Sequence, residues 1–113
     1  MINIKGIVGV NCITQSDGKK VFDEIVEAFR AGDHVVLDFE GVNIYASPFF
    51  NAALGKLYDL FTVLEVSTME YLNIRADGRS VIEHVMENAR EYYSKDQVAR
   101  KDQDDIIEKA VSE

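Results

Sequence analysis

The sequence predicts a single α/β domain whose strands and helices alternate in the order βαβαβα. A length of 113 residues fits one domain with one core. Apolar runs typical of buried strands alternate along the chain with segments whose apolar residues recur at helical spacing. Strands separated by helices are joined by right-handed crossovers, so we expect a mixed or mostly parallel sheet with helices packed on it.

The first third of the chain predicts a strand, a helix and a second strand. Residues Ile2–Ile7 alternate between apolar and polar, which is typical of a strand. Ser16-Asp17-Gly18 offers a helix cap, and Gly32 offers a helix stop, so we expect a helix over about 18–31. Its apolar face consists of Val21, Phe22, Ile25, Val26 and Phe29. The apolar run His34–Phe39 predicts the second strand.

A sharp corner between the second strand and the second helix is predicted at Ser47-Pro48. A serine hydroxyl can cap the first turn, and a proline in that turn loses an N–H that has no helical partner. The helix should span about 48–62 and be largely buried. Asn51, Gly55 and Asp59 recur at four-residue spacing and form a small polar stripe on it.

The last third predicts a strand, a helix and a polar tail. Residues Met69–Arg75 suit a third strand, and Asp77 suits the cap of a third helix. The apolar face of that helix consists of Val81, Ile82, Val85, Met86, Ala89 and Tyr93. We therefore expect a domain over residues 1–94 and a polar tail over 95–113, with a short helix from Asp105 that carries Ile106 and Ile107 on one side.

Composition limits the classes of partner. A net charge of −8 and scattered Lys and Arg side chains disfavour nucleic acid, whose phosphates require clustered cations. No apolar run approaches the roughly 18 residues of a membrane span, and the N-terminus lacks a secretory signal, so we expect a cytoplasmic protein that does not bind a membrane. The single Cys12 lies in an apolar context and should pack as a small hydrophobic residue.

Two segments around the corner resemble a known family. They are Leu37-Asp38-Phe39-x-Gly41-Val42 and Phe50-Asn51-Ala52-Ala53-Leu54-Gly55-x-Leu57-Tyr58. Both resemble the STAS-like domains of unknown function, which are relatives of sulphate-transporter and anti-sigma-factor-antagonist (STAS) domains. The likeness extends from about Ile4 to the helix that contains Glu87–Tyr93 and implies a STAS-like fold.

STAS domains that switch partners carry the pattern Asp-Leu-x-Gly-Val-x-x-x-Asp-Ser-Ser-Gly, with a phosphorylated serine at the helix start. An ungapped match places Ser47 on the first serine, Pro48 on the second and usual acceptor, and Ala46 on the acid. The resemblance therefore implies Ser47 as a candidate phospho-acceptor. The alternative is that Ser47 is only a structural cap.

Other reactive residues lack the spacing of a known site. Asp38 lies inside a strand, where its carboxylate needs hydrogen bonds from loop amides or belongs to a ligand site. His34 and His84 show no zinc-ligand spacing, so no metal is expected. The chain has no phosphate-binding glycine loop and no nucleophile motif. We therefore expect no cofactor, no catalytic residue and no enzymatic activity.

The leading hypothesis is a non-catalytic regulatory module that binds a protein partner. The resemblance implies that a histidine-kinase-like ATPase could be that partner. The expected contact surface consists of Asp38, Asn43, Tyr45, Pro48, Asn51, Gly55 and Asp59. The alternative is a domain that senses a small ligand or nucleotide with the amides at Ser47–Phe49. A homodimer formed through the second helix or through Ile106 and Ile107 also remains open.

Overall fold

The computed structural model describes residues 1–93, and its centre is a three-stranded parallel sheet. The strands lie in the order β1 (Ile2–Asn3), β3 (Val36–Asp38) and β5 (Glu70–Leu72). Asn3 pairs with Asp38, and Asp38 pairs with Leu72, so the carboxyl ends of all three strands lie at one edge. The predicted α/β architecture with a mostly parallel sheet is confirmed.

A second, two-stranded parallel sheet, which was not predicted, lies beside the first. It pairs β2 (Asn11–Cys12) with β4 (Ile44–Tyr45), with Asn11 opposite Ile44. Two residues per strand are too short to show an alternating pattern in a sequence. Its strand β4 connects β3 to the helix that was predicted from residue 48.

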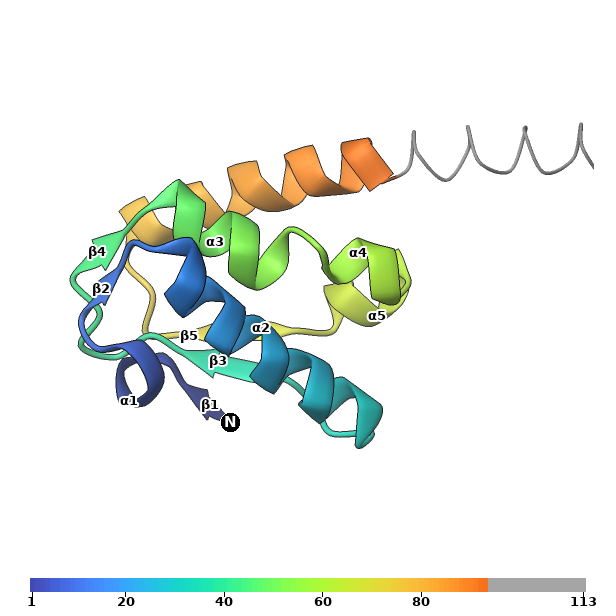
Figure 1. The fold of residues 1–113 in the computed structure, drawn as a ribbon, viewed down its shortest axis with the longest axis horizontal. Coiled ribbons are helices and arrows are strands. Elements are labelled where there is room, and N and C mark those ends of the chain that lie inside the picture. Colours follow the sequence, from blue (N-terminus) through green and yellow to red (C-terminus); the bar gives the residue numbers. More distant parts are fainter. Residues whose placement is uncertain (94–113) are drawn as a thin grey trace, which may run out of the picture.

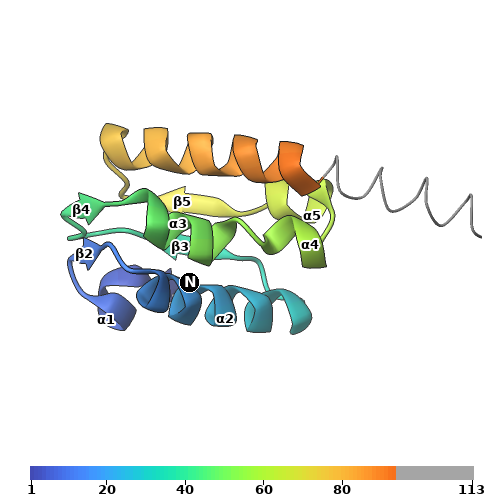
Figure 2. The same cartoon turned by 45° about the horizontal axis from the view of Figure 1, so that its top comes forward.

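The helices that pack on the sheet are α2 (Gln15–Arg30), α3 (Ser47–Leu54) and a C-terminal helix that the structure describes over residues 76–93. Figure 1 shows α2 and α3 side by side, and in Figures 1 and 2 the C-terminal helix runs along α3. The close approach of α2 to α3 depends on Gly18, because a Cβ there would lie 2.3 Å from the Phe49 carbonyl oxygen. The sequence places Gly18 at the expected helix cap, whereas in the structure it lies inside α2.

One apolar core joins these layers. Its largest fully buried side chains are Phe39, Phe49, Phe50, Ile4, Ile25, Leu37, Leu54, Leu57, Val21, Val35 and Cys12. The packing expected for Cys12 is confirmed. Burial of such side chains contributes roughly 1.5–3 kcal/mol each, and α3 alone supplies four buried residues to the core.

The opening strand is shorter than predicted. Only Ile2–Asn3 is extended, and Ile4–Val8 forms the short helix α1. The Asn3 side chain accepts a hydrogen bond from the Gly6 N–H, which starts the helix, and Gly9 ends it at φ 85°. Ile4 is fully buried while the next two residues, Lys5 and Gly6, are exposed, which fits one face of a helix rather than the alternation of a strand.

The limits of α2 also differ from the prediction. The helix begins at Gln15, because the Thr14 hydroxyl accepts from the Asp17 N–H and replaces the expected cap at residues 16–18. The predicted stop is confirmed: the helix ends at Arg30, and Gly32 takes a left-handed φ of 80°.

The predicted helix over 48–62 is divided into two short helices, and a third follows it. α3 ends at Leu54, α4 spans Leu57–Leu60, and α5 spans Val63–Ser67. Phe61 is extended, and Thr62 then starts α5 with a capping box in which Glu65 returns the hydrogen bond. A continuous helix would need the Thr62 and Glu65 side chains to give up these two bonds.

The third strand and the third helix shift at their junction. β5 stops at Leu72, because Asn73 takes a left-handed φ of 55°. The helix begins at residue 76, so Asp77 lies in its first turn rather than at its cap. The predicted tail over 95–113 and its short helix lie outside the described residues. Across residues 1–93 the model contains no helix with the length and apolar character needed to span a membrane.

Candidate functional site

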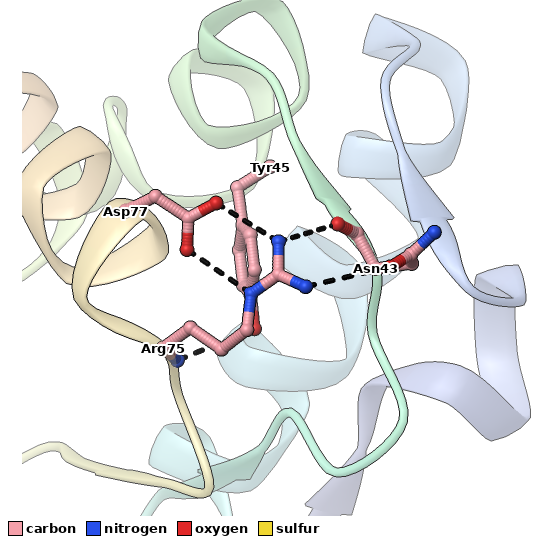
Figure 3. Close-up of polar contacts among 4 residues, drawn as sticks. All are labelled: Asn43, Tyr45, Arg75 and Asp77. Carbon is pink, nitrogen blue, oxygen red and sulfur yellow. Dashed lines mark hydrogen bonds and ion pairs between the residues drawn. The ribbon is translucent and has the colours of Figure 1, made fainter.

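The segment from Asn43 to Tyr45, which leads toward α3, is held in place by Arg75 from the other end of the domain's sequence (Figure 3). Its guanidinium donates to the Asn43 carbonyl oxygen over 2.7 Å and to the Asn43 side-chain oxygen over 3.4 Å. The same group donates to both carboxylate oxygens of Asp77, over 3.1 and 2.9 Å. Arg75 therefore connects the start of the C-terminal helix to the strand that leads into α3.

Tyr45 fixes the same segment from the inner side of β4. The Arg75 Cζ lies 5.3 Å from the centre of its ring, a cation–π contact. The opposite neighbours of the ring are Phe39 and Phe50, whose centroids are 6.1 and 6.2 Å away. Gly78 allows the ring to approach, because a Cβ at that position would lie 2.5 Å from it. Tyr45 is thus a half-buried anchor.

The ion pair in this cluster changes the proton affinity of both partners. Hydrogen bonds from Arg75 lower the pKa of Asp77, and the Asp77 carboxylate in turn raises the pKa of Arg75. Both groups are exposed, so solvent screens their attraction. Asp77 also lies at the start of a helix, where negative charge is favoured.

The start of α3 is open. Ala46 is the N-cap residue and has no side chain that bonds the first turn, so the prediction that Ser47 caps the helix is wrong. Ser47 is instead the first helical residue, followed by Pro48, and both are exposed. The Ala46 N–H donates to the Cys12 carbonyl oxygen over 2.9 Å, which sets α3 directly on the end of β2.

Three exposed apolar side chains lie on the paired β2 and β4 segments that precede this start. Val10, Ile13 and Ile44 retain 40%, 42% and 42% of their exposed area. Val10 accepts backbone hydrogen bonds from residues 43 and 44, while Ile13 follows Cys12, which bonds Ala46. We refer to Val10, Ile13, Ile44, Ser47 and Pro48 as the α3-start face.

Asp38 lies at the carboxyl end of β3 and serves the turn that follows. Its Oδ1 accepts hydrogen bonds from the Asn73 side-chain amide over 2.9 Å and from the Glu40 N–H over 3.0 Å. These two bonds lower its pKa, with the larger effect from Asn73. The predicted hydrogen bonding of Asp38 to a loop amide is confirmed. The bond to Asn73 ties the ends of β3 and β5 together.

The predicted surface residues fall into separate groups. Asn43 and Tyr45 meet in the Arg75 cluster, and Pro48 belongs to the α3-start face. Asn51 and Gly55 line a shallow groove against the C-terminal helix, of about 290 Å³. Asp59 lies on α4, beyond the break in the helix, so the three residues do not form one straight stripe.

Arg75 and Asn73 are the residues that sequence reasoning missed. Both follow the third strand, and the carboxyl ends of parallel strands meet at one edge of a sheet. That rule pairs the residues after β3 with those after β5 and could have indicated both contacts. The residue types gave no further signal, since a lone Arg or Asn after a strand is common on surfaces.

The remaining reactive groups lie elsewhere. His34 contacts Glu70 across the amino ends of β3 and β5, and the Asn88 side chain contacts His84 over 3.2 Å. Burial raises the pKa of the Cys12 thiol to about 12, so the group stays protonated. Within residues 1–93 no cluster of three or more His, Cys, Asp or Glu side chains has the geometry of a metal site.

Comparison with known proteins identifies the family. A family model described as a STAS-like domain of unknown function (DUF4325) matches residues 17–75. The match includes α2, β3, α3 and β5, and it ends at Arg75. No curated protein and no solved structure matches the chain. With more than half of its residues matched to that model and a parallel α/β fold, the chain belongs to the family of STAS-like domains of unknown function.

Proposed function

We propose that the chain is a non-catalytic regulatory module that binds another protein through the α3-start face. The observation that carries this proposal is the exposure of Val10, Ile13 and Ile44 on the paired β2 and β4 segments, which precede a helix start without a side-chain cap. Clustered exposed apolar side chains with polar neighbours are typical of protein-binding surfaces. Ile13 and Ser47 follow the carboxyl ends of β2 and β4, where α/β folds commonly bind their partners and ligands.

The fixed geometry of this face supports binding. Arg75, Tyr45 and Gly78 hold β4 from one side, and the bond from Ala46 to Cys12 holds it from the other. A surface that is ordered before binding loses less conformational entropy when it meets a partner. The polar cluster therefore acts as a support for the apolar residues that make the contact.

Ser47 is the proposed regulatory position on this face. Its side chain is exposed and begins a helix whose N-cap gives no side-chain hydrogen bond. The partial positive charge of the helix start would stabilise a phosphate there. The negative charge of that phosphate would disfavour contact between the neighbouring apolar side chains and an apolar partner. Phosphorylation would then release an apolar partner. The partner that the family resemblance suggests is a histidine-kinase-like ATPase.

The test is affinity purification of the full chain from its native cells, followed by binding measurements with each recovered protein. Ile44→Asp and Ile13→Asp should each weaken binding of the true partner by about tenfold or more. Leu64→Asp is the matched control, because Leu64 is also an exposed apolar residue but lies on α5, away from this face. Equal binding by Ile44→Asp and by the unchanged chain would refute the proposed face.

The phosphorylation step has its own readout. Phosphopeptide analysis of the purified chain should find phosphate on Ser47. Ser47→Glu should weaken binding of the partner, whereas Ser47→Ala should retain it. Phosphate found only on other residues, or equal binding by both variants, would refute regulation through Ser47. It would not affect the proposal that the α3-start face binds a partner.

A ligand-sensing function is the second candidate, and the open start of α3 favours it. Backbone N–H groups of a first turn without a side-chain cap can bind an anion. A thermal-shift panel of nucleotides and small anions distinguishes the two functions. A rise of several degrees with one compound, abolished by Ser47→Asp, would favour sensing, whereas a flat panel would favour protein binding.

A further inference from the structure

A groove at the opposite end of the domain from the α3-start face has an apolar floor and an acidic rim. It lies between the α4–α5 corner and the last described turns of the C-terminal helix, and its volume is about 830 Å³. Figures 1 and 2 show these elements together, away from β2 and β4. The volume lies in the range of pockets that hold ligands or anchoring side chains, roughly 300–1,000 Å³.

The apolar floor results from the break in the predicted helix. Phe61 is extended and packs on Phe29, with 4.7 Å between the ring centres. The residues on either side of the corner then turn outward, so Leu60 and Val63 retain 47% and 48% of their exposed area. Both line the groove. Two large apolar side chains held outward at one corner are suitable contacts for an apolar partner surface.

The charge around this floor has one dominant sign. Among the described residues that line the groove, Asp59, Glu65, Glu87 and Glu91 are acidic and Arg90 is basic. Glu87 and Glu91 are four residues apart and therefore lie on the same side of their helix. A partner with Lys or Arg beside its apolar residues would complement both the floor and the rim.

Charge also decides between the sources of such a partner. A second copy of this chain carries a net charge of −8. Residues 94–113 of the chain itself contain four Lys or Arg and six Asp or Glu. Both are acidic and would meet an acidic rim with like charge, so the complementary partner is another protein.

We propose that the α4–α5 groove binds a cationic amphipathic helix of a partner protein. Apolar residues of that helix at i, i+3, i+4 and i+7 contact Leu60, Val63 and Phe61, and its Lys or Arg residues face Glu87 and the other acids. This site is independent of the α3-start face and goes beyond the function proposed above. The domain would then carry two separate docking surfaces at its two ends.

The test measures binding of a fluorescent synthetic helix of about 16 residues, with Leu at the contact positions and Lys elsewhere, to the full chain. Val63→Asp and Glu87→Lys should each lower the affinity for this probe by about tenfold, and added salt should lower it further. Glu83→Lys is the matched control, since Glu83 is exposed on the same helix and does not line the groove. Ile44→Asp, at the other end, should change nothing.

Several results would overturn the proposal. Equal losses in Glu83→Lys and Glu87→Lys would show diffuse attraction rather than a site, as would equal binding of a probe with Glu in place of Lys. Tighter probe binding after Ile106→Asp and Ile107→Asp would show that the chain's own segment competes for the groove. A dimer that Val63→Asp dissociates in sedimentation would assign the groove to a second copy. Circular dichroism of each variant confirms that the fold is retained.

Discussion

The guanidinium of Arg75 lies over the ring of Tyr45, with 5.3 Å between Cζ and the ring centre, and donates to the carbonyl of Asn43. One side chain thus bonds the backbone of the segment before α3 and covers its aromatic anchor. Asp77 accepts from the remaining N–H groups and sets the direction of the guanidinium. The α3-start face consequently depends on a residue that does not belong to that face.

Replacement of Arg75 should loosen this segment without unfolding the domain. In Arg75→Ala, hydrogen exchange of the amides at residues 43–46 should quicken several-fold, because the segment loses its bond to Arg75 while the core remains intact. Arg79→Ala is the control, since Arg79 is exposed in the first turn of the C-terminal helix and does not contact this segment in the bonds described above. Exchange that is unchanged in Arg75→Ala would mean that β4 is held by its own strand pairing.

The crossing of α2 and α3 should be very sensitive to one methyl group. In Gly18→Ala the new Cβ would lie 2.3 Å from the Phe49 carbonyl oxygen and 2.8 Å from the Ala52 Cβ, so the helices must separate. We expect a loss of about 3 kcal/mol in the free energy of unfolding, measured with urea. Gly6→Ala is the control, because its nearest neighbour would be 3.4 Å away. Equal midpoints for the two variants would contradict the tight crossing.

The sequence predicts the frame of the fold because its signals are local. Apolar spacing over α2 and the glycine at residue 32 define that helix well, and a continuous apolar run defines β3. Local signals fail where a side chain bonds the backbone nearby. The Asn3 side chain turns part of an expected strand into α1, and the pair of Thr62 and Glu65 starts a separate helix where the expected one ends.

The candidate site was predicted in part for the same reason. The segment from Asn43 to Pro48 follows from the strand-to-helix corner, which is visible in the sequence. Arg75, in contrast, reaches Asn43 across 32 positions of the chain, and no local pattern reports such a contact. The exposed group of Val10, Ile13 and Ile44 was missed because it requires the unexpected sheet of β2 and β4.

The loss of folding stability at acid pH, called the acid limb below, should depend on Asn73. Its amide, followed by the Glu40 N–H, lowers the pKa of Asp38 in the folded chain. Asp38 therefore contributes stability above the ordinary Asp pKa of about 3.9, and this contribution is lost as pH falls through the lowered pKa. In Asn73→Ala the pKa of Asp38, followed by carboxyl NMR, should move upward and the acid limb should become flatter. Asn51→Ala should leave both unchanged.

The thiol of Cys12 should react only when the chain unfolds. Burial, with a smaller contribution from Asp17, raises its pKa to about 12. An unfolded Cys ionises near pH 8.5, so stability should fall as pH rises from about 8.5 toward 12. Iodoacetamide at pH 8 should label the native chain slowly and the urea-unfolded chain fully. Tyr71, whose pKa burial also raises to about 12, adds to this loss, and Tyr71→Phe should reduce it.

The two hydroxyl residues at helix starts should differ sharply in their effect on stability. The Thr62 hydroxyl accepts from the Glu65 N–H over 3.0 Å and belongs to a capping box, so Thr62→Ala should lower the free energy of unfolding by about 1 kcal/mol. Ser47 is already helical and caps nothing, so Ser47→Ala should change it by less than about 0.5 kcal/mol. Urea unfolding measures both. An equally large loss in Ser47→Ala and Thr62→Ala would show that the Ser47 hydroxyl caps α3 after all. A structural role would then explain the serine at this position without any role in partner binding.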